Sequence, residues 1–118
     1  MSNIVTEEQV AGFVARCQLV VDAYFQKDFP TLTPPVLTFD YGAAKKFCRI
    51  VRIDRRKDEN GNFIVEKGGA AWAFIDLTNG DVLKPSSYKT PAKHARGNIF
   101  DEHEGMEKIG AYGPAYLK

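Results

Sequence analysis

The chain has 118 residues, of which 44% are hydrophobic and 26% charged, and its formal net charge is +1. This length and composition predict a single globular domain, residues 1–118, that buries a core of its own. The net charge excludes a polycation, so any attraction for nucleic acid has to come from an uneven distribution of charge.

The charge is unevenly distributed along the chain. Seven basic residues and one acid, Asp54, lie in 45–57, whereas four acids and no Lys or Arg lie in 101–107. The two blocks can pair with each other, within one chain or between the subunits of a homo-oligomer. They can also face a partner of opposite charge.

The N-terminus and the cysteines indicate the compartment. The first residues have no basic start and no apolar signal core, and no apolar run approaches the roughly 20 residues that cross a bilayer. Cys17 and Cys48 are expected as separate buried thiols, which suits a reducing cytosol. A disulfide or a shared metal is the alternative. We therefore predict a cytoplasmic protein.

The first predicted element is an amphipathic helix that ends before Pro30. Thr6 is typical of an N-cap, and Gln9 at the third helical position completes a capping box. The apolar residues that follow recur at steps of three and four, the period of one helical face. They are Val10, Phe13, Val14, Cys17, Val20, Val21, Tyr24 and Phe25. We expect this face, about five turns long, to cover one face of a sheet.

An extended linker and a set of strands follow the helix. Three prolines, at 30, 34 and 35, each disfavour helix in the residue before them. A polar turn at 58–62 predicts a hairpin tip, and Gly68-Gly69 predicts a bulge or break. The expected strands are 36–41, 46–55, 63–66, 70–77 at the centre of the sheet, and 82–84.

Four arginines, at 49, 52, 55 and 56, could bind phosphate along the strand at 46–55 and just beyond it. Side chains alternate along a strand, so Arg49 and Arg52 fall on opposite faces. Aromatic residues interleave with this basic material, and a sheet face with exposed aromatics and rim arginines would stack bases. The alternative is that these aromatics are core beneath the helix; they are Phe47, Trp72, Phe74 and Tyr88.

A tight turn and a short helix are expected at the end of the sheet. Asn79-Gly80 is typical of a type I′ turn, because both residues accept the positive φ that this turn demands. Thr90-Pro91 predicts the N-cap and first residue of a helix over 92–96, which Gly97 stops in the left-handed conformation. The predicted fold class is therefore α+β, with a long N-terminal helix packed on a small antiparallel β-meander and a short helix after the last hairpin.

The segment 84–98 is the strongest candidate for function. It holds four permanent cations and a histidine, and no acid lies between Asp81 and Asp101. The start of the predicted short helix would point N–H groups and a partial positive charge at an anion. The alternative is that Thr90 only caps this helix and the lysines are solvated. The predicted ligand-binding residues are Arg52, Lys84, Ser87, Tyr88, Lys89, Thr90, Lys93, His94, Arg96 and Asn98.

Catalysis and metal binding find little support in the sequence. His94 has no neighbouring acid to orient it as a base, and neither a strand nor a helix would gather the side chains around His103. The chain carries no nucleophile elbow, zinc-protease helix, Walker loop or dinucleotide fingerprint. We expect no catalytic residue, no metal and no cofactor. An enzyme that uses His94 beside Lys93 and Arg96 is the weakest alternative.

Parts of the chain resemble a family of small, largely uncharacterised bacteriophage proteins. The long and specific block is Lys89-Thr-Pro-Ala-Lys-His-Ala-Arg-Gly-Asn-Ile-Phe-Asp101, while 46–52 and 73–85 are generic strand patterns and 112–117 is weaker. Members often have Trp where this chain has Tyr88, and a shorter turn than 58–69. The resemblance implies a viral context and brings no particular activity with it.

The sequence therefore predicts a non-enzymatic, phage-type protein that binds a phosphate-bearing ligand through a basic loop and short helix. The ligand would be nucleic acid or a small nucleotide signal. The alternative is a protein–protein interaction module that docks on an acidic surface of a host or phage protein. A homo-oligomer would cover the sheet face that one helix leaves open. If phage-encoded, the protein would act in the host cytoplasm and not at a membrane.

Overall fold

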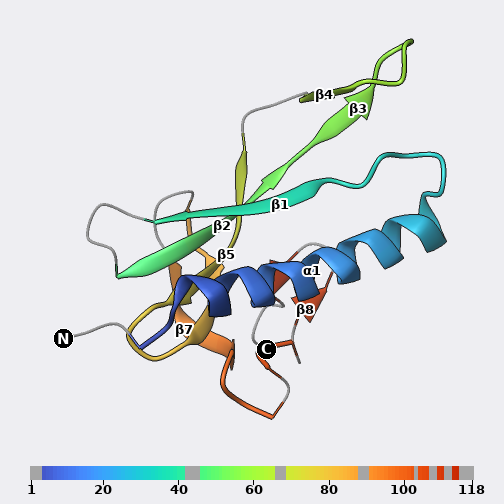
Figure 1. Ribbon diagram of the computed structural model, residues 1–118. Helices are drawn as coiled ribbons and strands as arrows, with labels where there is room; N and C mark the ends of the chain where they lie inside the picture. The colour runs from blue at the N-terminus through green and yellow to red at the C-terminus, as the bar shows by residue number, and fades with distance from the viewer. Residues whose placement is uncertain are drawn as a thin grey trace.

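The computed structural model describes residues 4–41, 46–65, 69–87, 91–102, 104–106, 109–110 and 113–114. Within them one helix, α1 (Glu7–Asp28), lies along one face of a five-stranded antiparallel sheet (Figure 1). The strand order is β1 (Val36–Tyr41), β2 (Phe47–Ile53), β5 (Ala70–Asp76), β6 (Asp81–Pro85) and β7 (Pro91–Asn98). Two small pairs complete the fold: β3 (Arg55–Lys57) with β4 (Phe63–Val65), and β8 (Ile109–Gly110) with β9 (Gly113–Pro114).

Helix α1 begins and ends where the sequence predicts. The Thr6 hydroxyl accepts a hydrogen bond from Gln9 N–H (3.2 Å), and Thr6 N–H donates to Gln9 Oε1 (2.9 Å), so the capping box is confirmed. The last helical carbonyls include that of Phe25, which accepts from Phe29 N–H (2.8 Å). Pro30 then prevents a further turn. The buried face is Val10, Phe13, Val14, Cys17, Val21 and Phe25.

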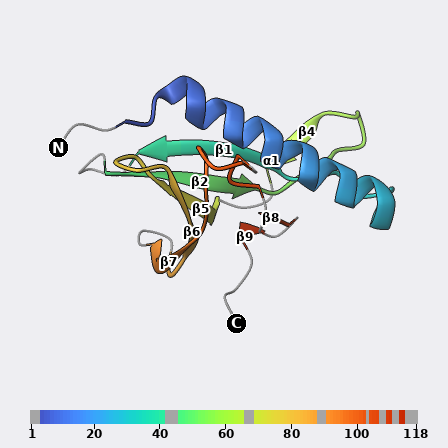
Figure 2. The same ribbon diagram turned by 90° about the horizontal axis from the view of Figure 1, so that it is seen from below.

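The core lies between α1 and the inner face of the sheet (Figure 2). Cys48 of β2 is paired with Ile75 of β5, and Ile50 is paired with Ala73. All four residues are buried in the cluster that includes the helix stripe. The strand at 70–77 was predicted to be central, and β5 is indeed the middle strand of the five. The broad α+β class, with the N-terminal helix on an antiparallel sheet, is therefore confirmed, but the sheet is larger than the small meander that the sequence suggested.

The opposite, outer face of the sheet carries the other half of each alternating strand. Arg49 lies there and makes a bidentate contact with Asp40 across β1 and β2, with Nη2–Oδ2 at 2.6 Å. Phe47 and Phe74 meet edge to face, with ring centroids 6.5 Å apart. The prediction that Arg49 and Arg52 fall on opposite faces is confirmed, because Arg52 lies beside Phe25 of α1. Of the aromatics considered for stacking, Trp72 is core beneath the helix.

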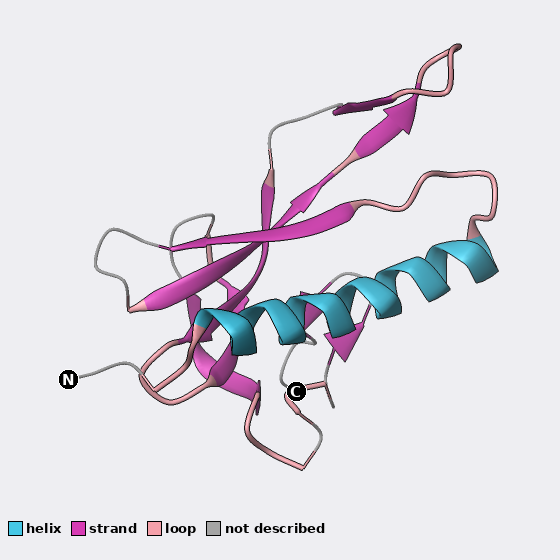
Figure 3. Cartoon of the chain, viewed as in Figure 1, coloured by secondary structure: helices cyan, strands magenta, loops and turns pink. Residues whose placement is uncertain are grey.

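The predicted short helix after the last hairpin is wrong. Residues Pro91–Asn98 form β7, an edge strand paired antiparallel with β6, in which Val82 is opposite Gly97 and Leu83 is opposite Ala95 (Figure 3). An edge strand tolerates Pro91 because one side of it needs no ladder hydrogen bond. Five helical residues could not have competed with the pairing that covers the edge of β6.

Gly97 does not stop a helix, and its conformation is not left-handed. A Cβ atom at this position would lie 3.3 Å from the carbonyl oxygen of Gly105, so a larger residue would crowd that turn. Thr90, the predicted N-cap of that helix, lies outside the described residues.

The turn between β5 and β6 also differs from the prediction. Only Gly80 has a positive φ (86°), whereas a type I′ turn would require one at Asn79 as well. Gly80 N–H donates to Asp76 O at 2.7 Å, which closes a longer loop. Asp76 Oδ1 accepts from both the N–H and the hydroxyl of Thr78 and so replaces the expected tight turn with an Asx turn.

The strand expected at 46–55 ends at Ile53, and β3 then continues away from the sheet as a two-stranded arm with β4 (Figure 1). The predicted hairpin tip at 58–62 is confirmed. Asp58 Oδ1 accepts from the N–H groups of Asn60 (2.8 Å) and Asn62 (2.9 Å), and Gly61 takes the positive φ. A bulge or break was expected at Gly68-Gly69, but Gly68 lies outside the described residues. A register shift between β2 and β5 is found at Trp72.

No helix in the described residues is both long enough and apolar enough to span a membrane.

The polar side chain of Gln18 ties α1 to the chain that follows it. Its Nε2 donates to Pro35 O (2.9 Å) and Asp22 Oδ1 (3.0 Å), and its Oε1 accepts from Leu37 N–H at 2.7 Å. One amide therefore fixes the proline linker and the start of β1 against the helix.

We expect Gln18→Leu to lower the free energy of unfolding by about 2 kcal/mol, because the Pro35 carbonyl and the Leu37 N–H lose their partner in a partly buried place. Urea titration followed by circular dichroism measures this. The control is Leu19→Ala at the next position, where the side chain is 69% exposed and the change should stay within about 0.5 kcal/mol. A Gln18→Leu protein as stable as the parent would contradict the assigned role.

Candidate functional site

The basic residues of 46–57 are divided between two places. Arg49 is held on the outer face by Asp40. Arg52, at the end of β2, points to the inner side, where its Nε donates to Asp54 Oδ1 at 2.8 Å. Arg55, Arg56 and Lys57 lie on β3, in the arm. Of the basic residues in this block, only Arg52 and those that follow it therefore lie close together in the fold.

From Arg52 onward the basic residues line two adjoining hollows at the C-terminal end of α1, which we call the arginine cleft. The first has a volume of about 270 Å³ and is lined by Phe25, Leu32, Thr33, Pro35, Arg52, Asp54, Arg55 and Arg56. The second has about 260 Å³ and is lined by Pro30, Thr31, Leu32, Thr33, Pro34, Arg55, Lys57 and Phe63. The two hollows share Leu32, Thr33 and Arg55 in their linings and so lie side by side.

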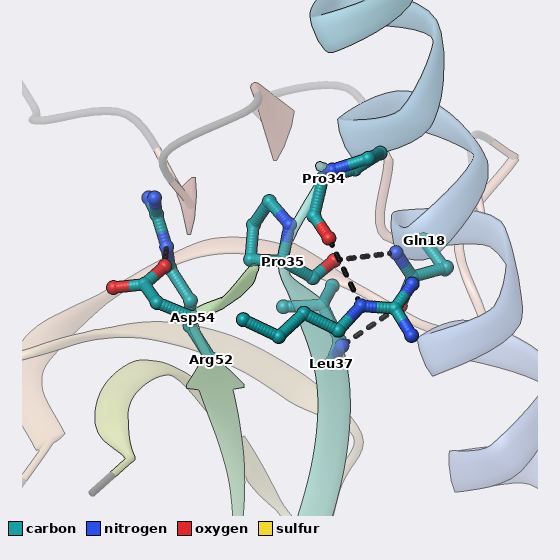
Figure 4. A network of polar contacts seen from close by, with 7 residues as sticks. Gln18, Pro34, Pro35, Leu37, Arg52 and Asp54 are labelled. Carbon is teal, nitrogen blue, oxygen red and sulfur yellow. Dashed lines mark hydrogen bonds and ion pairs between the residues drawn. The ribbon is translucent and has the colours of Figure 1, made fainter. Parts of the chain in front are cut away.

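The proline linker lines both hollows of the arginine cleft, and Figure 4 shows how polar contacts hold it. Gln18 holds the Pro35 carbonyl, and Arg55 Nε donates to the Pro34 carbonyl at 3.3 Å. Each proline fixes its own φ and disfavours helix in the residue before it. The linker therefore has few alternative shapes, and the guanidinium of Arg55 is positioned by a fixed acceptor.

Phe63 of β4 lies at the outer end of the cleft. Lys57 is its partner in the register of the arm, and Arg55 is on the same side of β3, two residues away. Arg55 Cζ lies 4.2 Å from the centre of the Phe63 ring and Lys57 Nζ lies 5.4 Å from it. Although it makes these contacts, Phe63 remains 54% exposed. The arm thus presents an exposed aromatic ring with two cations beside it.

Three acids lie near these cations. Asp54 is paired with Arg52. Asp58 uses its carboxylate on the N–H groups of the hairpin tip, and Glu59 is exposed at that tip. The cleft itself is lined by three arginines, one lysine and one acid. Such a surface suits an anion with several oxygens, because guanidinium groups bind phosphate or carboxylate in a fork.

The residues predicted from 84–98 take different positions. Lys84 is half-buried on β6, Ser87 is exposed just after it, and Lys93 is exposed on β7. Tyr88, Lys89 and Thr90 lie outside the described residues, and the side chain of His94 is not described. Of the predicted residues that are described, Arg52 alone lines the arginine cleft, since β5 and β6 separate β2 from β7.

Two residues of this segment have clear positions in the fold. Arg96 is buried, at 9% exposure. The Asn98 amide nitrogen donates to Asn79 O (2.8 Å) and Asp81 Oδ1 (3.0 Å), while its oxygen accepts from Phe100 N–H at 2.8 Å. Asn98 therefore fastens β7 to the turn before β6. Contact of either residue with a ligand stays a prediction.

The residues that sequence reasoning missed are Lys57, Phe63 and the linker residues Leu32 to Pro35. Arg55 and Arg56 were considered as phosphate ligands and do lie at the cleft. The missed signal was the register of the hairpin: a tip at 58–62 pairs Lys57 with Phe63. The contribution of the linker depends on the hydrogen bonds of Gln18 and Arg55, which link parts far apart in sequence.

A larger open groove of about 520 Å³ lies between the first half of α1 and the turn after β7. Arg16 crosses it: Nη2 donates to Glu104 O (3.4 Å), and Nε lies 3.2 Å from Glu104 Oε2 without the alignment of a hydrogen bond. The Arg16 guanidinium thus joins the turn to the helix. The lining mixes acids, one cation and apolar residues, and it shows no preference for one kind of ligand.

Among the described residues, no three His, Cys, Asp or Glu side chains come together as a metal site would require. Cys17 and Cys48 are free thiols in the core. Burial raises the pKa of each to about 12, an effect that nearby Arg16 partly offsets at Cys17 and Asp40 reinforces at Cys48. Neither thiol is therefore suited to act as a nucleophile near neutral pH.

Fold and site together define a small α+β protein, with one helix on an antiparallel sheet and a basic cleft at the base of a projecting arm. Over residues 6–115 the chain matches the model of a family of unknown function, DUF7717, and it belongs to that family. No curated protein and no solved structure matches the chain.

We expect Arg96→Ala to lower the free energy of unfolding by about 2 kcal/mol, because it removes a buried polar group and the packing of its methylenes. Lys93→Ala, an exposed position on the same strand, should change it by less than about 0.5 kcal/mol. Thermal unfolding followed by circular dichroism compares the two variants. Equal stabilities would mean that Arg96 is not part of the framework.

We expect neither cysteine to react with iodoacetamide at pH 8 in the folded protein, since with a pKa near 12 only about one thiol in ten thousand is ionised. In urea both should react, because the unfolded thiols regain their usual pKa. Mass spectrometry counts the added groups. Modification of the folded protein at the rate of the unfolded one would contradict the burial of these thiols.

Proposed function

We propose that this protein is a non-enzymatic binding protein for a phosphate-bearing ligand, and that the phosphate binds in the arginine cleft. The observation that carries the proposal is the lining of the cleft: Arg52, Arg55, Arg56 and Lys57 line two adjoining hollows. The ligand would be nucleic acid or a small nucleotide. A phage-encoded protein of this kind would act in the host cytoplasm.

Preorganisation favours this cleft over an ordinary basic surface. Asp54 orients Arg52, the Pro34 carbonyl orients Arg55, and the linker behind them is stiffened by prolines. A long cationic side chain that is already held loses less rotamer freedom when it binds an anion. Partial enclosure by Phe25 and Leu32 also lowers the local dielectric, which strengthens each charge-assisted hydrogen bond.

The binding mode differs from the one that the sequence suggested. No short helix offers its N-terminus to an anion, since Pro91–Asn98 is a strand. Lys84 on β6, Ser87 just beyond its end and Lys93 on β7 stay proposed contacts at a second position, apart from the cleft. A ligand that contacts both positions would be a polymer and not a single nucleotide.

The alternative is a module that docks on an acidic surface of another protein. Exposed Leu32 and Phe63 beside arginines favour it, because aromatic residues and Arg are enriched in the centres of protein interfaces.

We expect fluorescence anisotropy to show binding of a labelled twelve-residue oligothymidylate at low salt, weakening steeply as salt rises. Arg56→Gln should weaken binding several-fold and reduce the slope of log K against log salt by about 0.7, the value for one phosphate contact of a single strand. Arg49→Gln is the matched control, since it removes the same charge from β2 on the outer face, where Asp40 holds it.

Two outcomes would contradict the proposal. If both variants lose affinity equally, the attraction is a general effect of charge and does not depend on the cleft. If the unmodified protein shows no binding at about 100 μM, well beyond the usual range of non-specific affinity, the acidic protein partner becomes the better hypothesis.

A further inference from the structure

We propose that Phe63 is a base-stacking platform and that the ligand of the arginine cleft is a single-stranded nucleic acid; the inference rests on the proposed function. Phe63 lies on the projecting arm, more than half exposed, and lines the same hollow as Arg55 and Lys57. Aromatic rings at the edge of a basic groove are how proteins hold unpaired bases without regard to sequence.

The arm gives Phe63 no core to enter. It is a two-stranded ribbon, and its partner strand β3 is Arg-Arg-Lys. A ribbon of this kind has no second layer in which an aromatic ring could be buried. Leu or Phe residues exposed singly are ordinary on protein surfaces. What distinguishes Phe63 is the pair of cations held beside its ring at 4.2 and 5.4 Å.

The outer hollow suits a base and the inner hollow suits a phosphate. The outer hollow, with Phe63, Pro30 and Pro34, offers flat apolar surfaces to a base. The inner hollow is lined by Arg52 and Arg56, and their positive charge favours a phosphate. Arg55 belongs to both and can contact the phosphate that joins a stacked nucleotide to its neighbour. A polar, charged chain with flat apolar bases matches this alternation.

A duplex fits the same surface less well. Its bases are stacked on each other and offer no free face to Phe63. A ribbon can enter the major groove of DNA, but the tip of this ribbon carries Asp58 and Glu59, which would approach the phosphates that line the groove. Unpaired bases can reach Phe63 without bringing the tip near the backbone.

The test compares three labelled probes by anisotropy: a twelve-residue oligothymidylate, an abasic strand with the same number of phosphates, and a twelve-base-pair duplex. We expect the parent protein to bind the oligothymidylate about fivefold or more tightly than the abasic strand, the lower end of what one stacked base contributes. Phe63→Leu should abolish this preference and leave binding of the abasic strand unchanged, while Phe63→Tyr should keep it.

Ile64→Ala is the matched control, because Ile64 is the next residue on the same strand and faces the other side of the arm. It should keep the preference for bases. Equal binding of the oligothymidylate and the abasic strand would overturn stacking while phosphate binding stands. Tighter binding of the duplex would overturn the single-stranded ligand. Failure of all three probes to bind would overturn the proposed function itself.

Discussion

The packing of α1 on one face of the sheet is the constraint on which the rest of the structure depends. Phe13, Cys17 and Val21 require apolar partners, and these are supplied by the inward residues of β2 and β5, such as Ile50 and Ile75. Because side chains alternate, a slip of one residue would turn the charged positions of β2 inward. The helix therefore fixes the register of the sheet and, with it, the face on which each arginine lies.

The arginine cleft lies where the chain continues from β2 into β3, beyond the part of the sheet on which α1 packs. Val36, the first residue of β1, is paired with Ile53, and Ala70, the first residue of β5, is paired with Arg52, so neither neighbour of β2 extends past its end. The chain continues past them as β3, whose pairing is with β4. Arg52 lies on the inner face but beyond the main stripe of α1, beside its last buried residue, Phe25. Cations are tolerated there because the proline linker, and not a close-packed core, is their neighbour.

The elements that local patterns determine could be predicted from the sequence. The capping box at Thr6 and the three-and-four spacing after it define α1, and the apolar run at 70–77 defines the central strand. The segment after Pro85 could not be predicted in the same way. Its local signals, Thr90-Pro91 and Gly97, favour a short helix, but the unpaired edge of β6 offers more hydrogen bonds to a strand. That competition is decided by pairing with the preceding strand, which the local signals within 90–97 do not show.

The candidate site was predictable only in part, for a related reason. Charge density singled out 84–98, yet density does not show that Arg96 is buried or that Asn98 is used to hold a turn. The cleft instead combines residues from the linker, β2 and the arm, and two hydrogen bonds, from Gln18 and Arg55, position its wall. The one part within reach of sequence reasoning was the cross-strand pair of Lys57 and Phe63, which follows once the hairpin tip is placed at 58–62. Hairpin register thus carries information about binding surfaces that residue composition does not.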